Sequence, residues 1–78
     1  MDDGAGIVRI VAEAVKRARK SAGWSQEDLA LEAGVDRTYI SQVERGKRNV
    51  TIVVLSKIAR ALKTTPDRLL IPPRKSKS

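Results

Sequence analysis

The chain has 78 residues, enough for one small domain, and its net charge at neutral pH is +7. It contains no cysteine and no histidine, which excludes disulfides, thiolate zinc sites and the commonest nucleophile–base pairs. We therefore expect no enzyme, no metal site and no cofactor. The sequence pI is about 10.4, and a compact domain this basic most often binds a polyanion.

The hydropathy pattern favours nucleic acid over a membrane as that polyanion. No apolar run approaches the roughly 18 residues that a spanning helix needs, and the start Met1-Asp2-Asp3 is acidic, unlike a signal peptide. A membrane-surface helix would carry Trp or Phe on its apolar face, but the chain has no Phe, and Trp24 lies at a predicted helix junction. We expect a cytoplasmic protein with one domain at 7–71 and flexible termini at 1–6 and 72–78.

The predicted fold is all-α, with five helices and no sheet, and the first two helices have clear signals. The second helix begins after Ser25, an N-cap with Asp28 at the capping-box position, and ends at Gly34. The first helix spans about 7–22, and its predicted apolar stripe, at steps of three and four residues, consists of Ile7, Val11, Val15, Ala18 and Ala22.

Three further helices complete the predicted bundle. The third is capped by Asp36 and runs from Arg37 to about Arg45. The fourth follows Thr51 and buries Leu55, Ile58, Ala59 and Leu62. The fifth is short, with Thr65 as cap, Pro66 at its first position, and Leu69 and Leu70 closing the core. Helix stop signals stand at Gly23, Gly34 and Gly46.

Residues 25–46, SQEDLALEAGVDRTYISQVERG, carry the functional signal. Gly34 supplies the left-handed backbone of a sharp interhelical turn, and Val35 is an apolar plug between the second and third helices. A turn this tight fixes a steep angle between the two helices. One helix can then cross the DNA backbone while the other enters the major groove.

The third helix divides into a polar and a mainly apolar arc when about 100° is advanced per residue. Glu44 lies on the apolar arc, beside Ile40, and a carboxylate there needs a cationic partner. The outward arc carries only hydrogen-bonding side chains that suit base edges or phosphates: Arg37, Thr38, Ser41, Gln42 and Arg45. Arginine forks onto guanine and glutamine onto adenine in such readout.

This pattern resembles the lambda-repressor-like, or Cro/CI-type (Xre-like), helix-turn-helix family over roughly 11–70. The resemblance rests on Ser25-Gln26, Leu29-Ala30, Ala33-Gly34-Val35, Ile40-Ser41, Glu44-Arg45-Gly46 and Leu69-Leu70. It implies a five-helix bundle with the third helix as recognition helix. It also implies that Gln26 bonds a phosphate, that Arg19 pairs with Glu44, and that dimers form through the fourth and fifth helices.

Within that family the chain is most similar to the controller proteins of bacterial restriction–modification systems. The similar segments are 36–41, 44–45 and 49–51 (DRTYIS, ER and NVT). The resemblance implies a dimer on palindromic operators upstream of its own gene and the nuclease gene. Two alternatives stay open: an antitoxin that binds DNA and a toxin protein, and a stand-alone phage-type repressor.

The resulting hypothesis assigns a role to each candidate residue. Base readout falls to Arg37, Thr38, Gln42 and Ser41. Phosphate contacts fall to Gln26, Tyr39, Arg45, Lys47, Arg48 and Asn49. The dimer interface is assigned to Val53, Leu70 and Ile71. The expected partners are double-stranded DNA and a second copy of the chain, with RNA polymerase as a further candidate and no small-molecule ligand.

Overall fold

The computed structural model describes residues 5–71 and, from residue 6 on, their side chains. These residues form four α-helices, α1 (Ala5–Ser21), α2 (Gln26–Ala33), α3 (Arg37–Glu44) and α4 (Ile52–Ala61), and a 3-10 turn, η1 (Pro66–Leu70). No strand occurs between residues 5 and 71. The all-α prediction is therefore confirmed, but the predicted count of five helices is wrong. Five residues led by a proline form only a short 3-10 turn.

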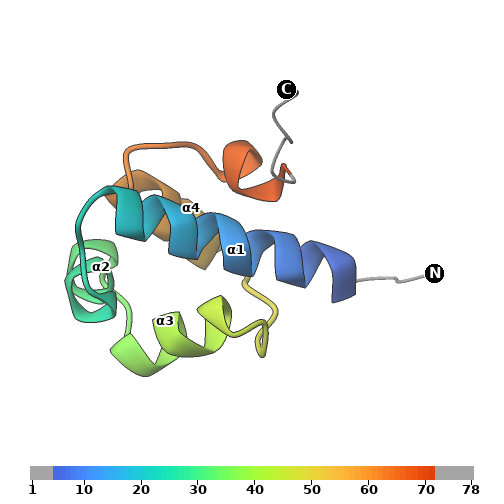
Figure 1. Cartoon of the computed structure of the whole chain (residues 1–78), viewed down its shortest axis with the longest axis horizontal. Coiled ribbons are helices and arrows are strands. Elements are labelled where there is room, and N and C mark those ends of the chain that lie inside the picture. The colour runs from blue at the N-terminus through green and yellow to red at the C-terminus, as the bar shows by residue number, and fades with distance from the viewer. Residues whose placement is uncertain (1–4, 72–78) are drawn as a thin grey trace.

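The helices pack around α1, which crosses the molecule (Figure 1). α1 contacts α3 on one side and η1 on the other, while α2 packs on both α3 and α4. The largest fully buried side chains come from all four helices: Val15, Leu29, Ile40, Val43 and Ile58. No helix in the described part of the chain is long and apolar enough to cross a membrane.

The helix starts show which capping predictions hold. The capping box of α2 is present, since the Asp28 N–H donates to Ser25 Oγ at 3.0 Å and the Ser25 N–H donates to Asp28 Oδ2 at 2.9 Å. Thr51 caps α4 through a 3.1 Å bond from the Val54 N–H. The predicted side-chain caps of Asp36 and Thr65 are wrong, because neither side chain bonds the helix start that follows it. Both residues are exposed.

The buried face of α1 is rotated from the predicted stripe. Val11 and Val15 are buried as expected, but Ile7 is 44% exposed and Ala22 lies beyond the end of the helix. The buried side chains of α1 are Val11, Ala12, Ala14, Val15 and the charged Arg19.

The ends of the domain also differ from the prediction. α1 begins at Ala5, so residues 5 and 6 belong to a helix and not to a flexible terminus. The remaining predicted flexible segments, 1–4 and 72–78, lie outside the described residues. At the C-terminal side Leu69 is buried but Leu70 is 39% exposed, so Leu69 alone closes the core there.

Candidate nucleic-acid interface

The turn between α2 and α3 fixes the position of α3. Gly34 has a φ of 72°, and its N–H donates to the carbonyls of Ala30 and Leu31 at the end of α2. The Val35 N–H donates to the Ala30 carbonyl at 3.0 Å, and the Val35 side chain packs half-buried against the core. The left-handed glycine and the apolar residue after it thus turn the chain sharply into α3, as the sequence predicted.

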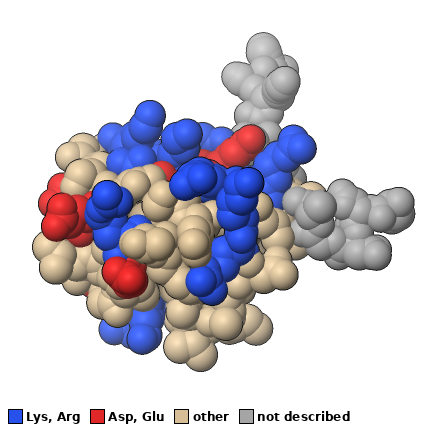
Figure 2. Space-filling view, turned by 90° about the horizontal axis from the view of Figure 1, so that it is seen from below, with Lys and Arg blue, Asp and Glu red and all other residues tan. Residues whose placement is uncertain are grey.

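α3 has one buried and one exposed face. Ile40 and Val43 are 0% and 1% exposed and hold the inner face in the core. On the outer face Arg37, Thr38 and Arg45 are exposed, whereas Ser41 and Gln42 are half-buried. Figure 2, which looks at the molecule from the side where α3 lies in Figure 1, shows Lys and Arg spread over this face. Acidic side chains gather mainly at the end of the molecule where α2 lies.

A buried ion pair ties α3 to α1. Arg19 Nε donates to Glu44 Oε2 at 2.7 Å, and Arg19 Nη2 donates to Glu44 Oε1 at 2.9 Å. Arg19 Nη1 donates to the Trp24 carbonyl at 2.7 Å. The hydrogen bonds that Arg19 donates to the Glu44 carboxylate raise the pKa of the Arg19 guanidinium above its ordinary value. Arg19 is thus the cationic partner that Glu44 needs on the apolar side of α3.

Gln26 joins the same network from the start of α2. Its Nε2 donates to Glu44 Oε1 at 3.1 Å, and the side chain is half-buried. This bond was not expected from the sequence, because no local signal connects residues 18 positions apart. An amide nitrogen carries two hydrogens, so one remains for the phosphate contact that the resemblance implies. Trp24 packs against the core from the preceding loop.

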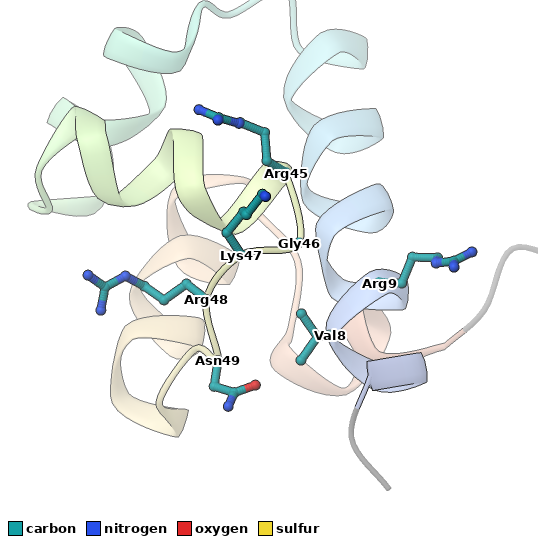
Figure 3. A pocket seen from close by; sticks show the side chains of 7 residues that line it. All are labelled: Val8, Arg9, Arg45, Gly46, Lys47, Arg48 and Asn49. Carbon is teal, nitrogen blue, oxygen red and sulfur yellow. The ribbon is translucent and has the colours of Figure 1, made fainter. Parts of the chain in front are cut away.

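A basic hollow lies between the loop after α3 and the first turns of α1 (Figure 3). Its volume is about 620 Å³, and four of its lining residues are the cations Arg9, Arg45, Lys47 and Arg48. Val8, Gly46 and Asn49 complete the lining. Lys47, Arg48 and Asn49 were predicted as phosphate contacts, but Arg9 was missed. Arg9 is one of several basic residues on α1, so the sequence did not single it out, and only the fold places it opposite the loop.

The side chain of Arg48 contacts those of Gln42 and Tyr39 beside α3. Arg48 Nε donates to Gln42 Oε1 at 2.9 Å. The guanidinium carbon of Arg48 lies 4.5 Å from the centre of the Tyr39 ring, within the range of a cation–π interaction. The Tyr39 ring also packs partly against the core. The structure therefore joins a predicted base contact to two predicted phosphate contacts.

The residues predicted for the dimer interface are all exposed. Val53 is 64%, Leu70 39% and Ile71 56% exposed, on or directly after α4 and η1, which contact each other. Ile52, at the first position of α4, is 79% exposed and was not in the predicted set. Its signal was available, since it is an apolar residue directly after the N-cap Thr51.

Comparison with known proteins places this geometry in a family. Residues 15–69 match the helix-turn-helix family HTH_3. The control protein C.SmaI of Serratia marcescens is 47% identical over 64 residues, which cover 82% of this chain and 76% of that protein.

Two solved structures share the fold. The hypothetical transcription factor NHTF from Neisseria superposes with a TM-score of 0.85 at 38% identity, covering 94% of this chain and 84% of that one. The restriction–modification controller protein C.Esp1396I, solved as a tetramer with its natural 35 base-pair operator, gives a TM-score of 0.75 at 38% identity, covering 81% and 83%. This chain belongs to the Cro/CI-type (Xre-like) helix-turn-helix family of DNA-binding transcription regulators, which are not enzymes, and its homologues include restriction–modification controller proteins.

Proposed function

We propose that this regulator binds palindromic operator DNA as a dimer and reads it with α3, in the manner of a restriction–modification controller. The observation that carries the proposal is the division of α3. Its inner face is locked into the core by Ile40, Val43 and Glu44, and its outer face presents Arg37, Thr38 and Arg45 to solvent. Such a helix meets the requirements of a recognition helix, which needs fixed backbone and free hydrogen-bonding side chains.

Two sets of contacts follow from this arrangement. Arg37 and Thr38, at the start of α3, read base edges together with Ser41 and Gln42, because the N-terminal residues of a recognition helix lie deepest in the groove. Three cations of the basic hollow hold the flanking phosphates and fix the position of α3, together with Tyr39 and Asn49; these cations are Arg9, Arg45 and Lys47. Gln26 binds a phosphate beside the start of α2, where unpaired N–H groups also face outward.

Dimerisation follows from the amount of DNA that one helix can read. A single recognition helix contacts a few base pairs, too few to mark one site among the roughly 10⁶ or more competing sites of a genome. Two copies related by a two-fold axis double the site and place their recognition helices about 34 Å apart. The exposed apolar residues Ile52 and Val53 on α4, and Leu70 and Ile71 at η1, provide the contact surface.

The names of two relatives support a proposal for the genes that this chain regulates. Because C.SmaI and C.Esp1396I are controllers, we propose that the chain controls its own gene and a neighbouring restriction–modification gene, with RNA polymerase as a further partner. The antitoxin alternative depends on a toxin-covering segment after Leu70, and residues 72–78 lie outside the described part. No observation favours it over the controller.

Substitution of Arg37 tests the readout by α3. Binding-site selection from random duplex DNA first gives the operator half-site. Arg37→Ala should then weaken binding to that site by about 1–3 kcal/mol, and binding to random DNA by much less. Lys16→Ala, which removes an exposed cation from α1, is the matched control and should leave the ratio of the two affinities unchanged. An equal loss on both DNAs would contradict a base contact by Arg37.

Charged substitutions test the dimer surface. Ile71→Asp and Val53→Asp should shift the protein toward monomer in sedimentation at micromolar concentration, and should weaken binding to a full palindrome more than to a half-site. Leu31→Asp is the control, because Leu31 is 76% exposed but lies on α2. A dimer that survives both substitutions would place the contact elsewhere on the molecule.

A further inference from the structure

The contact between Gln42 and Arg48 fixes which way the Gln42 amide points. A guanidinium only donates hydrogen bonds, so the 2.9 Å contact from Arg48 Nε must end on the amide oxygen of Gln42. The stack of the same guanidinium on the Tyr39 ring, at 4.5 Å, holds it over α3. The three side chains therefore support one another in a single arrangement.

This arrangement changes what Gln42 can read. A glutamine recognises adenine with both ends of its amide, since its oxygen accepts from N6 and its nitrogen donates to N7. The Gln42 oxygen is already engaged by Arg48. That bond takes one of the two lone pairs of the oxygen. The groups left are the second lone pair, the Gln42 amide hydrogens and the terminal Nη hydrogens of Arg48, so donors outnumber acceptors.

A surface on which donors outnumber acceptors, with the terminal nitrogens of an arginine at its edge, suits guanine. Guanine presents two acceptors, N7 and O6, in the major groove, whereas adenine presents N7 beside the N6 amino donor. The two terminal Nη groups of Arg48 match the two acceptors of guanine, whereas at adenine one of them would face the N6 amino donor. The paired side chains should therefore reject adenine at the position where an isolated glutamine would select it.

We propose that Gln42 and Arg48 act as one reading unit, stacked on Tyr39, that selects guanine over adenine at one base pair of each half-site. The proposal rests on the proposed function, since it requires α3 to lie in the major groove. Arg48 belongs by sequence to the loop after α3, where phosphate contact is the expected role. Its bonds to two residues of α3 draw its guanidinium to the reading face instead.

The test compares base preference in four forms of the full chain, by selection from random duplex DNA followed by titration of single-base variants of the selected site. The wild type should prefer guanine over adenine by about tenfold at one position of each half-site. Arg48→Ala frees the Gln42 oxygen and should move that preference to adenine. Gln42→Met removes both amide groups and should abolish the preference there. Lys47→Ala is the control, because Lys47 lies in the same loop and no contact between its side chain and Gln42 is found among the described residues; it should weaken all sites equally.

Each other outcome overturns the inference in a recognisable way. If Arg48→Ala lowered affinity equally for all four bases, Arg48 would be a phosphate contact and no part of a reading unit. If the wild type chose adenine at the position that Gln42→Met affects, Gln42 would use both amide atoms on DNA. A wild type that selected no sequence at all would contradict the proposed function itself. Thermal unfolding of each variant separates these outcomes from misfolding, since Arg48 is exposed and Gln42 half-buried.

Discussion

At the scale of single residues, Glu44 is one of two charged residues that are buried in the described part of the chain. Its carboxylate is buried and accepts three hydrogen bonds, two from Arg19 and one from Gln26. A buried pair adds little net stability over an apolar pair of the same size, but loss of one partner strands the other charge. The pair therefore makes the position of α3 depend on α1 and α2 together.

Loss of the Glu44 carboxylate should destabilise the fold. We expect Glu44→Ala to lower the free energy of unfolding by about 3–5 kcal/mol, because Arg19 stays buried without its counter-charge. Urea unfolding followed by circular dichroism measures the change. The double variant Arg19→Met with Glu44→Leu removes both charges and should recover most of the loss. A Glu44→Ala protein as stable as the wild type would show that Arg19 readily finds another partner or water.

Asp67 should give the stability a small dependence on acid. The Thr65 hydroxyl beside it, more than any other group, holds the pKa of the Asp67 carboxyl below its ordinary value. A lowered pKa in the folded state stabilises the protein above the unfolded pKa of about 3.9, and the contribution is lost as pH falls through the folded pKa. Thr65→Val should therefore be less stable than the wild type at neutral pH, and the difference should vanish once the pH lies below the folded pKa of Asp67. Urea unfolding of both proteins across this range would contradict the assignment if the gap stayed constant.

At the scale of the elements, the helix ends show two ways to stop a helix. Three ends carry glycine with positive φ, at Gly23, Gly34 and Gly46. After α4 the left-handed residue is Lys63, with a φ of 60°, and the N–H of the next residue closes the turn on the Ala59 carbonyl at 2.9 Å. A side chain disfavours this conformation, so the end of α4 carries some backbone strain.

Glycine at position 63 should relieve that strain. We expect Lys63→Gly to raise the free energy of unfolding by about 0.5–1 kcal/mol, since the left-handed penalty exceeds the extra entropy that glycine loses on folding. The reverse change, Gly34→Ala, should lower it by about 1 kcal/mol, because Gly34 has a φ of 72°. Thermal unfolding measures both. A loss of stability in Lys63→Gly would mean that the lysine side chain makes a compensating contact.

The signals that predicted the elements were local ones. The Ser25–Asp28 capping box, the glycine stops and the two arcs of α3 depend on residues a few positions apart, and the structure has all of them. The end of α4 had no such signal, because Lys63 occupies the place of a glycine. The five-residue segment that begins at Pro66 could not be assigned as an α-helical or a 3-10 turn from its caps alone.

Contacts between distant residues could not be predicted from spacing. The apolar pattern of α1 identified only part of its buried face, because the charged Arg19 lies on that face while the apolar Ile7 is 44% exposed. The Gln26–Glu44 bond and the Gln42–Arg48 bond depend on how the helices and the loop after α3 come together. Spacing marked the outer side of α3 as a candidate site but did not show which of its side chains hold one another.

At the scale of the whole molecule, the charges fall into two groups that differ in their contact with water. Arg37, Arg45, Lys47 and Arg48 are exposed on the side of α3 and its loop. The Arg19–Glu44 pair is buried. Dissolved ions screen the first group strongly and the second only weakly. DNA binding and folding should therefore respond differently to salt.

Salt should release the DNA and leave the protein folded. The logarithm of affinity should fall with the logarithm of salt concentration at a slope of about −0.9 per neutralised phosphate, so several contacts give a slope of several units. Lys47→Ala should reduce that slope by about one unit. Over the same range the free energy of unfolding should change by less than about 1 kcal/mol. Fluorescence anisotropy and urea unfolding at matched salt concentrations measure both, and parallel loss of fold and affinity would contradict the separation.

The buried inner face of α3 also bears on the heat of binding. Ile40 and Val43 are already almost without exposed surface in the free chain, so α3 needs no folding step when it reaches DNA. Segments that fold on binding show a large negative heat-capacity change, because they bury apolar surface of their own. For this regulator we expect a smaller negative heat-capacity change, which comes only from the protein surface that the DNA covers. The recognition helix enters the groove already ordered, so binding loses little conformational entropy from its backbone.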